Sequence, residues 1–149
     1  MSEDQLRIFI DCIVRYFNHA SEVTVKVGTP YLEHNTSAKA MDYSGVIAIS
    51  GNHRGSVCFT APKILLKHLL LSIGENDTSE ENLADIIGEV SNTLSGNARK
   101  ELGKNFVIST PTVVKGLPSE AHLPKTMRSF VIPILWKGYA ASVVICLKA

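Results

Sequence analysis

Between positions 85 and 98 the chain reads DIIGEVSNTLSGNA, and its polar residues recur at the spacing of one helix face. At about 100° per residue, Asp85, Glu89, Asn92 and Gly96 project within about 60° of one another, and Gly88 lies beside them. Each glycine costs a helix interior about 1 kcal/mol relative to Ala, and Asn competes for backbone hydrogen bonds. Such breaks of local rules often mark a working surface, and bare backbone at two glycines would let another protein approach closely.

Glu89 and Asn92 are about one helical turn apart and could together bind a partner and orient a water molecule. The Glu89 carboxylate can hold a cation of a partner through a charge-assisted hydrogen bond. The Asn92 amide offers an acceptor oxygen and two donors, enough to hold and aim water. Neither side chain is a strong nucleophile and no histidine lies nearby in the sequence, which disfavours a nucleophilic hydrolase. An ordinary solvated helix face is the alternative interpretation.

A long amphipathic helix must position these residues. Thr78 is the predicted N-cap, Glu81 completes a capping box, and Gly103 is the stop signal. The opposite face of this helix is an apolar stripe about 160° wide, which predicts how it packs on the rest of the chain. The stripe consists of Leu83, Ile86, Ile87, Val90, Leu94, Ala98 and Leu102.

The remaining patterns predict two further helices, several strands and two hairpins. The first helix covers residues 4–20, and a second, mostly apolar helix over 62–73 is expected to be buried or to lie at an interface. Strands are predicted at 22–30 and 105–114, hairpins at 43–50 with 55–61 and at 128–136 with 139–148, and loops at 34–39 and 115–127. Pro133 would best suit an edge strand or a bulge.

The order helix, strand, loop, hairpin occurs twice. Five apolar positions of the first helix match the long helix at an offset of 77, Thr29-Pro30 matches Thr110-Pro111 at 81, and Ser56-Val57 matches Ser142-Val143 at 86. We therefore predict one α+β domain over 1–149, in which two pseudo-symmetric helix-strand-hairpin halves share one sheet with helices packed on it. At offset 77, Glu89 falls on Cys12 and Asn92 on Arg15, so the first helix lacks the pair.

Composition excludes several other classes of function. Among 149 residues, 15 Lys+Arg against 14 Asp+Glu leave no basic footprint for nucleic acid, and 45% hydrophobic residues argue against disorder. The acidic N-terminal residues are unlike a signal peptide, and no apolar run reaches the roughly 18 residues of a membrane span. Three cysteines without a CxxC motif predict a reducing compartment, the cytoplasm. Five scattered histidines predict no metal site, and Cys12 is expected on the polar side of the first helix.

The stretch 85–98 resembles the signature helix of the chemotaxis phosphatases CheX and CheC, with which FliY belongs. The motif of that family is an acidic residue or Ser, three positions, Glu, two positions, Asn. Asp85, Glu89 and Asn92 satisfy it, and the flanking Gly88 and Gly96 add to the match. The order of helices and strands also resembles the family's fold.

The resemblance implies a phosphatase that acts on a CheY-like response-regulator receiver phosphorylated on an aspartate. In the family, the Glu contacts a receiver lysine and the Asn orients the attacking water, and we carry these roles to Glu89 and Asn92. The receiver supplies Mg²⁺, so no cofactor of the chain's own is expected. One site per chain resembles CheX, whereas many CheC relatives carry two. A homodimer is also implied, and the hairpin ending in SVVICL could pair across it.

One departure separates the chain from the family pattern. The family often places a proline some two dozen positions after the Asn, whereas here Pro111 follows Asn92 by 19 positions and Lys115 stands near the expected place. A non-catalytic adaptor that binds a receiver or another signalling partner is therefore the alternative to the enzyme. A dimeric structural module is a third interpretation.

Overall fold

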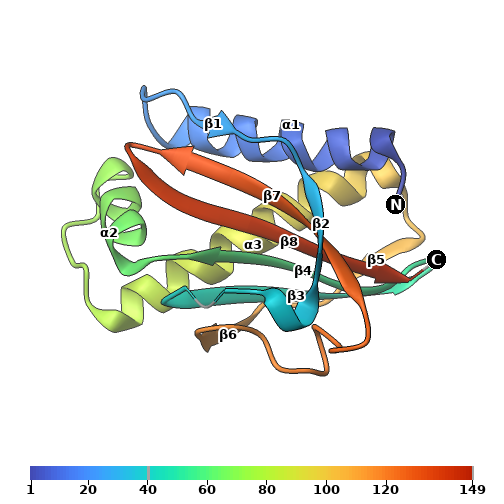
Figure 1. The fold of residues 1–149 in the computed structure, drawn as a ribbon. Coiled ribbons are helices and arrows are strands. Elements are labelled where there is room, and N and C mark those ends of the chain that lie inside the picture. The colour runs from blue at the N-terminus through green and yellow to red at the C-terminus, as the bar shows by residue number, and fades with distance from the viewer. Residues whose placement is uncertain (40, 149) are drawn as a thin grey trace.

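A computed structural model describes residues 1–39 and 41–148. In these residues three α-helices pack on an eight-stranded antiparallel sheet (Figure 1). The helices are α1 Glu3–Ala20, α2 Lys63–Ser72 and α3 Glu80–Leu102, with a 3-10 turn, η1, at Asn35–Ser37. The strands are β1 Lys26–Val27, β2 Tyr31–His34, β3 Tyr43–Gly51, β4 Arg54–Ala61, β5 Phe106–Ile108, β6 Thr112–Lys115, β7 Arg128–Trp136 and β8 Tyr139–Lys148. The α+β class is thereby confirmed.

The two predicted hairpins, β3–β4 and β7–β8, form the centre of the sheet. The strand order is β1-β7-β8-β4-β3-β5, with β2 also on β7 and β6 also on β3. The short strands that follow α1 thus pair with the second hairpin, and those that follow α3 pair with the first. A pseudo-symmetric relation between the halves stays a prediction.

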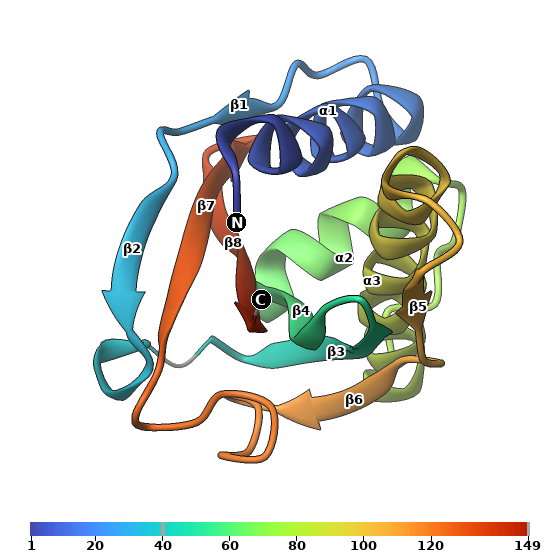
Figure 2. The same ribbon diagram turned by 90° about the vertical axis from the view of Figure 1, so that its right-hand side faces the viewer.

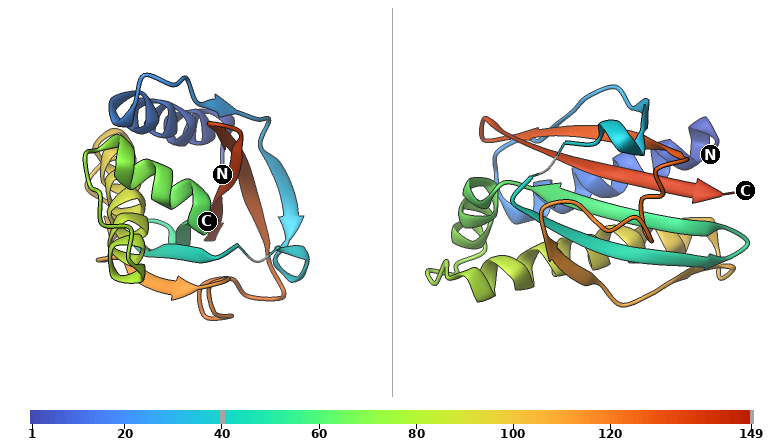
Figure 3. Two further views of the ribbon diagram at one scale, coloured as in Figure 1. Left: turned by 90° about the vertical axis from the view of Figure 1, so that its left-hand side faces the viewer. Right: turned by 60° about the horizontal axis from the view of Figure 1, so that its bottom comes forward.

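The helices lie on one face of the bent sheet (Figure 2) and enclose the main core. The predicted stripe of α3 is buried from Leu83 to Ala98, and Phe9, Ile13 and Phe17 of α1 are buried against it. The left panel of Figure 3 views the molecule from the end where α2 lies. This helix packs on both α3 and β8. Trp136 is the largest fully buried side chain.

Both long strands predicted to follow helices are shorter than expected. The strand predicted over 22–30 is interrupted: only Lys26–Val27 pair before the chain breaks at Gly28 to Pro30 and resumes as β2. The strand predicted over 105–114 divides into β5 and β6 around Pro111. In each case a proline, which lacks an N–H to donate, lies where the ladder breaks.

Pro133 lies in β7, which is not an edge strand, because β7 pairs with β8 on one side and with β1 and β2 on the other. Its carbonyl accepts a hydrogen bond from Gly28 N–H at 2.9 Å. Gly28 lies in the break between β1 and β2, so the missing N–H of Pro133 faces that break.

The predicted cap of α3 is wrong by one residue. The helix begins at Glu80, and the Ser79 side chain, not that of Thr78, accepts from Asn82 N–H at 3.4 Å. Thr78 and Ser79 are both competent caps, so the sequence alone could not choose between them. The end at Leu102 with Gly103 as C-cap is confirmed.

The hairpin ending in SVVICL has no free edge on β8. That strand pairs with β7 along one side and with β4 along the other. The pairing of this strand across a dimer interface is therefore wrong for the chain as folded. The sheet ends instead in the short strands β1 and β2 at one side and β5 and β6 at the other.

Candidate functional site

The middle of α3 is fixed on the sheet at Ser91. Its buried hydroxyl lies 2.9 Å from the carbonyl oxygen of Gly45 on β3 and 2.8 Å from that of Ile87. A Cβ at Gly45 would come within 2.6 Å of the Ile87 carbonyl oxygen, so only glycine permits this approach. Because residue 91 faces the sheet, Glu89, about 160° round the helix, points to the opposite side, and Asn92, about 100° round, points sideways. Both side chains are exposed.

The structure brings most of the predicted site residues together. Asp85, Glu89 and Asn92 are exposed, and all three line one open groove along α3 with a volume of about 510 Å³. Gly88 also lines the groove. Gly96 lies one helical turn beyond Asn92, is half-buried and does not line the groove. A Cβ at Gly96 would meet no atom within 4 Å.

Gly88 has a packing role within the chain. It is buried, and a Cβ at this position would lie 3.2 Å from Val113 Cγ2 and 3.7 Å from Pro111 Cγ. Pro111 and Val113 form one flank of the groove. Pro111 therefore lies beside the candidate site in space, although its distance from Asn92 along the chain differs from the family pattern.

The other flank of the groove comes from the end of α2, with α1 beside it, and the sequence did not connect either helix to the site. Leu70 and Ile73, at the end of α2, line the groove. Tyr16 of α1 lies close enough to Glu89 to sense its charge: burial, and then the Glu89 carboxylate, raise the pKa of Tyr16 to about 12. No sequence signal linked these residues to Glu89, because only the packing of the helices brings them there.

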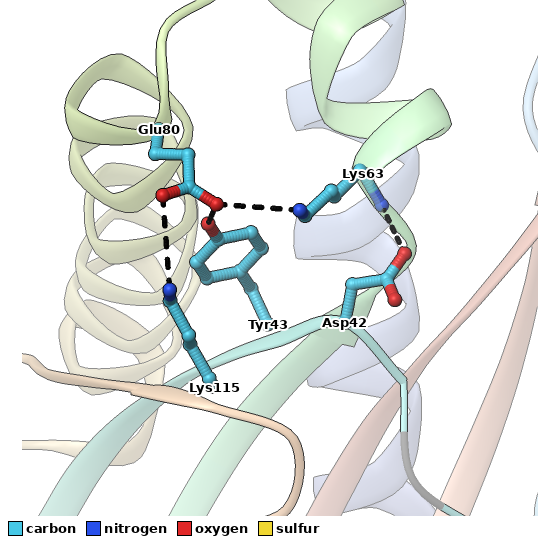
Figure 4. Close-up of polar contacts among 5 residues, drawn as sticks. All are labelled: Asp42, Tyr43, Lys63, Glu80 and Lys115. Carbon is cyan, nitrogen blue, oxygen red and sulfur yellow. Dashed lines mark hydrogen bonds and ion pairs between the residues drawn. The ribbon is translucent and has the colours of Figure 1, made fainter.

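A charged network holds the N-terminal end of α3 (Figure 4). The Glu80 carboxylate accepts from Lys63 Nζ at 3.3 Å and from Tyr43 Oη at 3.4 Å, and it pairs with Lys115 Nζ at 3.7 Å. The hydrogen bond from Lys63, followed by the charge of Lys115, holds the pKa of Glu80 below its usual value. Asp42 accepts from the backbone N–H of Lys63 at 2.7 Å. The start of α3 is thus tied to α2, β3 and β6.

Cysteine chemistry does not fit the structure. Cys12, Cys58 and Cys146 are free and buried, so the expected place of Cys12 on a polar helix side is wrong. Residue 12 faces the core because the apolar side of α1 is wider than its main stripe. Burial raises the pKa of Cys12 to about 11 and that of Cys58 to about 12, which disfavours their thiolates.

The described residues contain neither a cluster of potential metal ligands nor a membrane-spanning helix. Among 1–39 and 41–148, no three His, Cys, Asp or Glu side chains are placed to hold a metal ion. No helix there is long and apolar enough to cross a membrane.

The Glu89 carboxylate is available to a partner. The ion pairs in the described part of the chain engage the carboxylates of Glu3, Glu80 and Glu101 instead.

The model of one protein family, chemotaxis phosphatase CheX, matches residues 43–135, which is more than half of the chain and includes the groove on α3. The chain belongs to the CheX family. No curated protein matched it.

Solved structures of CheX and CheC-like proteins share this fold. A CheC-like superfamily protein of Shewanella sp. PV-4 superposes with a TM-score of 0.84 at 24% identity, covering 100% of both chains. A putative chemotaxis protein of Desulfovibrio vulgaris Hildenborough gives 0.78 at 27% identity, covering 97% of both chains. The CheX–CheY–BeF₃–Mg²⁺ complex of Borrelia burgdorferi gives 0.77 at 20% identity, covering 99% of this chain and 100% of that one.

Proposed function

We propose that this CheX-family protein dephosphorylates the aspartyl phosphate of a CheY-like receiver domain. The observation that carries the proposal is the exposure of Glu89 and Asn92, one helical turn apart, in one groove on a helix fixed to the sheet through Ser91. The Borrelia burgdorferi relative, whose structure is a complex with CheY, BeF₃ and Mg²⁺, supports a receiver as the partner.

In this proposal the chain supplies positioning and the receiver supplies the reactive groups. Glu89 binds a receiver lysine through a charge-assisted hydrogen bond. Asn92 enters the receiver's site and holds a water molecule in line with the acyl phosphate. The water oxygen bonds to phosphorus, the bond from phosphorus to the aspartyl oxygen breaks, and inorganic phosphate and a free aspartate result. Such transfers have a loose transition state, so alignment and charge stabilisation supply most of the catalysis.

Mg²⁺ belongs to the receiver in this scheme. It is held there by carboxylate and phosphate oxygens, and it neutralises the charge that develops on the phosphoryl group. The chain contributes no metal ligand of its own to the step. Asp85, Gly88 and Gly96 are proposed as partner-binding positions along the same helix.

The proposal includes one site per chain, a homodimer and a cytoplasmic location. In the first helix the position that matches Glu89 is Cys12, which is buried. No second surface of the same kind is therefore available on α1. The dimer and the location follow from the resemblance to CheX and from the sequence composition.

The roles of the two residues can be separated by kinetics. Glu89→Gln removes the charge that binds the receiver, and we expect it to raise the receiver concentration that gives half-maximal dephosphorylation. Asn92→Ala removes the group that holds water, and we expect it to lower the maximal rate about 100-fold or more, as for a residue that orients the nucleophile. Glu81→Gln is the matched control, because Glu81 is an exposed carboxylate on α3 outside the groove.

A binding measurement distinguishes the enzyme from an adaptor. If wild type binds the phosphorylated receiver and leaves its rate of phosphate loss unchanged, the chain is an adaptor and the enzymatic proposal is wrong. If it binds no receiver, both fail, and a structural module remains.

A further inference from the structure

Ile73, immediately after α2, connects the groove on α3 to a second hollow. Its side chain is 51% exposed, and it lines both the groove with Glu89 and Asn92 and a neighbouring hollow of about 400 Å³. The second hollow is lined from α1, from α3 and from this end of α2; its residues are Arg15, Tyr16, His19, Ala20, Ile73, Thr93 and Asn97. The two hollows therefore adjoin at one exposed apolar side chain.

A receiver needs more surface than Glu89 and Asn92 offer. A standard interface buries about 800 Å² of each partner, and its affinity comes from a few anchors packed among polar neighbours. Two exposed polar side chains on one helix supply neither that area nor an apolar anchor. The contact must therefore extend over a flank of the groove.

The two flanks differ in how much apolar surface they leave free. Val113, on the β6 flank, is 37% exposed, and its Cγ2 is turned toward Gly88. Ile73 is more exposed and adjoins a hollow with a partly buried aromatic ring, that of Tyr16. The flank formed by α1 and α2 therefore offers more of what an interface anchor requires.

Charge also favours this flank. Arg15 and His19 lie on its α1 side and are exposed. The ion pair of Arg15 with Glu101 is long, 4.0 Å, and about half-exposed on both sides, so it holds Arg15 only weakly. Mg²⁺ is bound in proteins through oxygen ligands such as carboxylates, so we expect the surface of a receiver around its Mg²⁺ and phosphorylation site to be acidic. Basic side chains beside the groove complement such a surface.

We propose that the hollow between α1, the end of α2 and α3 is a docking surface for the same phosphorylated receiver, with Ile73 as its apolar anchor and with Arg15 and His19 on its rim. This inference rests on the proposed function. It assigns receiver affinity to this flank and leaves the chemical step to Glu89 and Asn92.

The test compares three exposed aliphatic residues changed to Ser. Ile73→Ser removes the anchor, Ile64→Ser alters a 43% exposed residue of α2 that lines neither hollow, and Val113→Ser alters the opposite flank. Affinity is measured for the CheY-like receiver of the same organism loaded with Mg²⁺ and beryllofluoride, and turnover for the phosphorylated receiver. We expect Ile73→Ser to weaken binding and raise KM about tenfold with kcat unchanged, as for an interface anchor. Ile64→Ser should match wild type.

A negative charge introduced on the rim gives a second test of the same surface. His19→Glu, on the α1 rim, should also weaken binding, and more strongly at low ionic strength. The surface is refuted if Ile73→Ser and His19→Glu both bind like wild type, or if only Val113→Ser weakens binding. In either case wild type still dephosphorylates the receiver, so the proposed function survives. Failure of wild type to bind any receiver overturns both.

Discussion

The hydroxyl of Ser91 donates a hydrogen bond to the carbonyl of Gly45, and this contact seats α3 on β3 one residue before Asn92. The approach is close because Gly45 has no side chain: a Cβ there would lie 2.6 Å from the backbone oxygen of Ile87. The orientation of Glu89 and Asn92 toward the partner therefore depends on a glycine some forty-five positions earlier in the chain.

Gly45→Ala tests this seating. The added methyl meets backbone that cannot move freely, so we expect a loss of about 1–3 kcal/mol in the free energy of unfolding, as for overpacked cores. Because α3 must shift, kcat for receiver dephosphorylation should also fall. Denaturant unfolding and turnover measure the two effects. Ser91→Ala is the gentler comparison, with an expected loss of about 1 kcal/mol, and an unchanged unfolding midpoint for Gly45→Ala would contradict the close approach.

Gly96→Ala separates folding from partner binding. A Cβ at Gly96 has open space around it, so the change should stabilise the helix by about 1 kcal/mol. If the bare backbone is a receiver contact, as we propose, the same methyl should raise KM several-fold. Thermal unfolding and steady-state kinetics measure the two quantities. A stabilised variant with wild-type KM would remove Gly96 from the partner surface.

The side of the sheet away from the helices is held by Asn35. Its Nδ2 donates to the Pro124 carbonyl at 2.8 Å, its N–H donates to the Met127 carbonyl at 3.0 Å, and its Oδ1 accepts from Ser129 Oγ. Asn35→Ala should cost about 2–3 kcal/mol, because it leaves buried polar groups without partners. Turnover per folded molecule should stay at the wild-type value. Thr36→Ala, at the exposed neighbouring position, should be nearly neutral in an unfolding titration.

The network at Glu80 predicts a pH dependence of stability. Lys63, and next Lys115, lower the pKa of this carboxyl, so the folded state favours its ionised form. The stabilisation is fully present above the usual carboxyl pKa of 4.5 and is lost as the pH falls through the lower, folded-state pKa. Glu80→Gln should therefore be less stable than wild type at pH 7 by a small, salt-sensitive amount, and the difference should vanish in acid. Glu81→Gln is the control; a Glu80→Gln difference that persists in acid would contradict the ion-pair origin.

The sequence predicted the elements that carry strong periodic patterns. The stripe from Leu83 to Ala98 and the two hairpins formed as expected because burial of one face determines both. Two predictions were wrong for local reasons. Ser79 caps α3 in place of the adjacent Thr78, and the strand predicted over 22–30 breaks at Gly28.

Within the candidate site, the sequence predicted one helix face and missed its surroundings. Asp85, Glu89 and Asn92 share a groove because helical spacing alone places them together. Tyr16 and Ile73 join them only through the packing of α1 and α2 on α3, and no spacing along the chain encodes that. Cys12 was misplaced for the same reason, since the pattern of one helix does not show how much of its surface a neighbour covers.

In the proposed function, Asn92 orients the attacking water. The most direct measurement is the first-order loss of phosphate from a Mg²⁺-bound, phosphorylated CheY-like receiver of the same organism, with saturating wild type and Asn92→Ala side by side and Asn18→Ala, at an exposed position of α1, as the control. We expect wild type and Asn18→Ala to accelerate the loss, whereas Asn92→Ala should bind the receiver and leave the rate near that of the receiver alone. Acceleration by Asn92→Ala equal to that of wild type would contradict the role of Asn92 in orienting water.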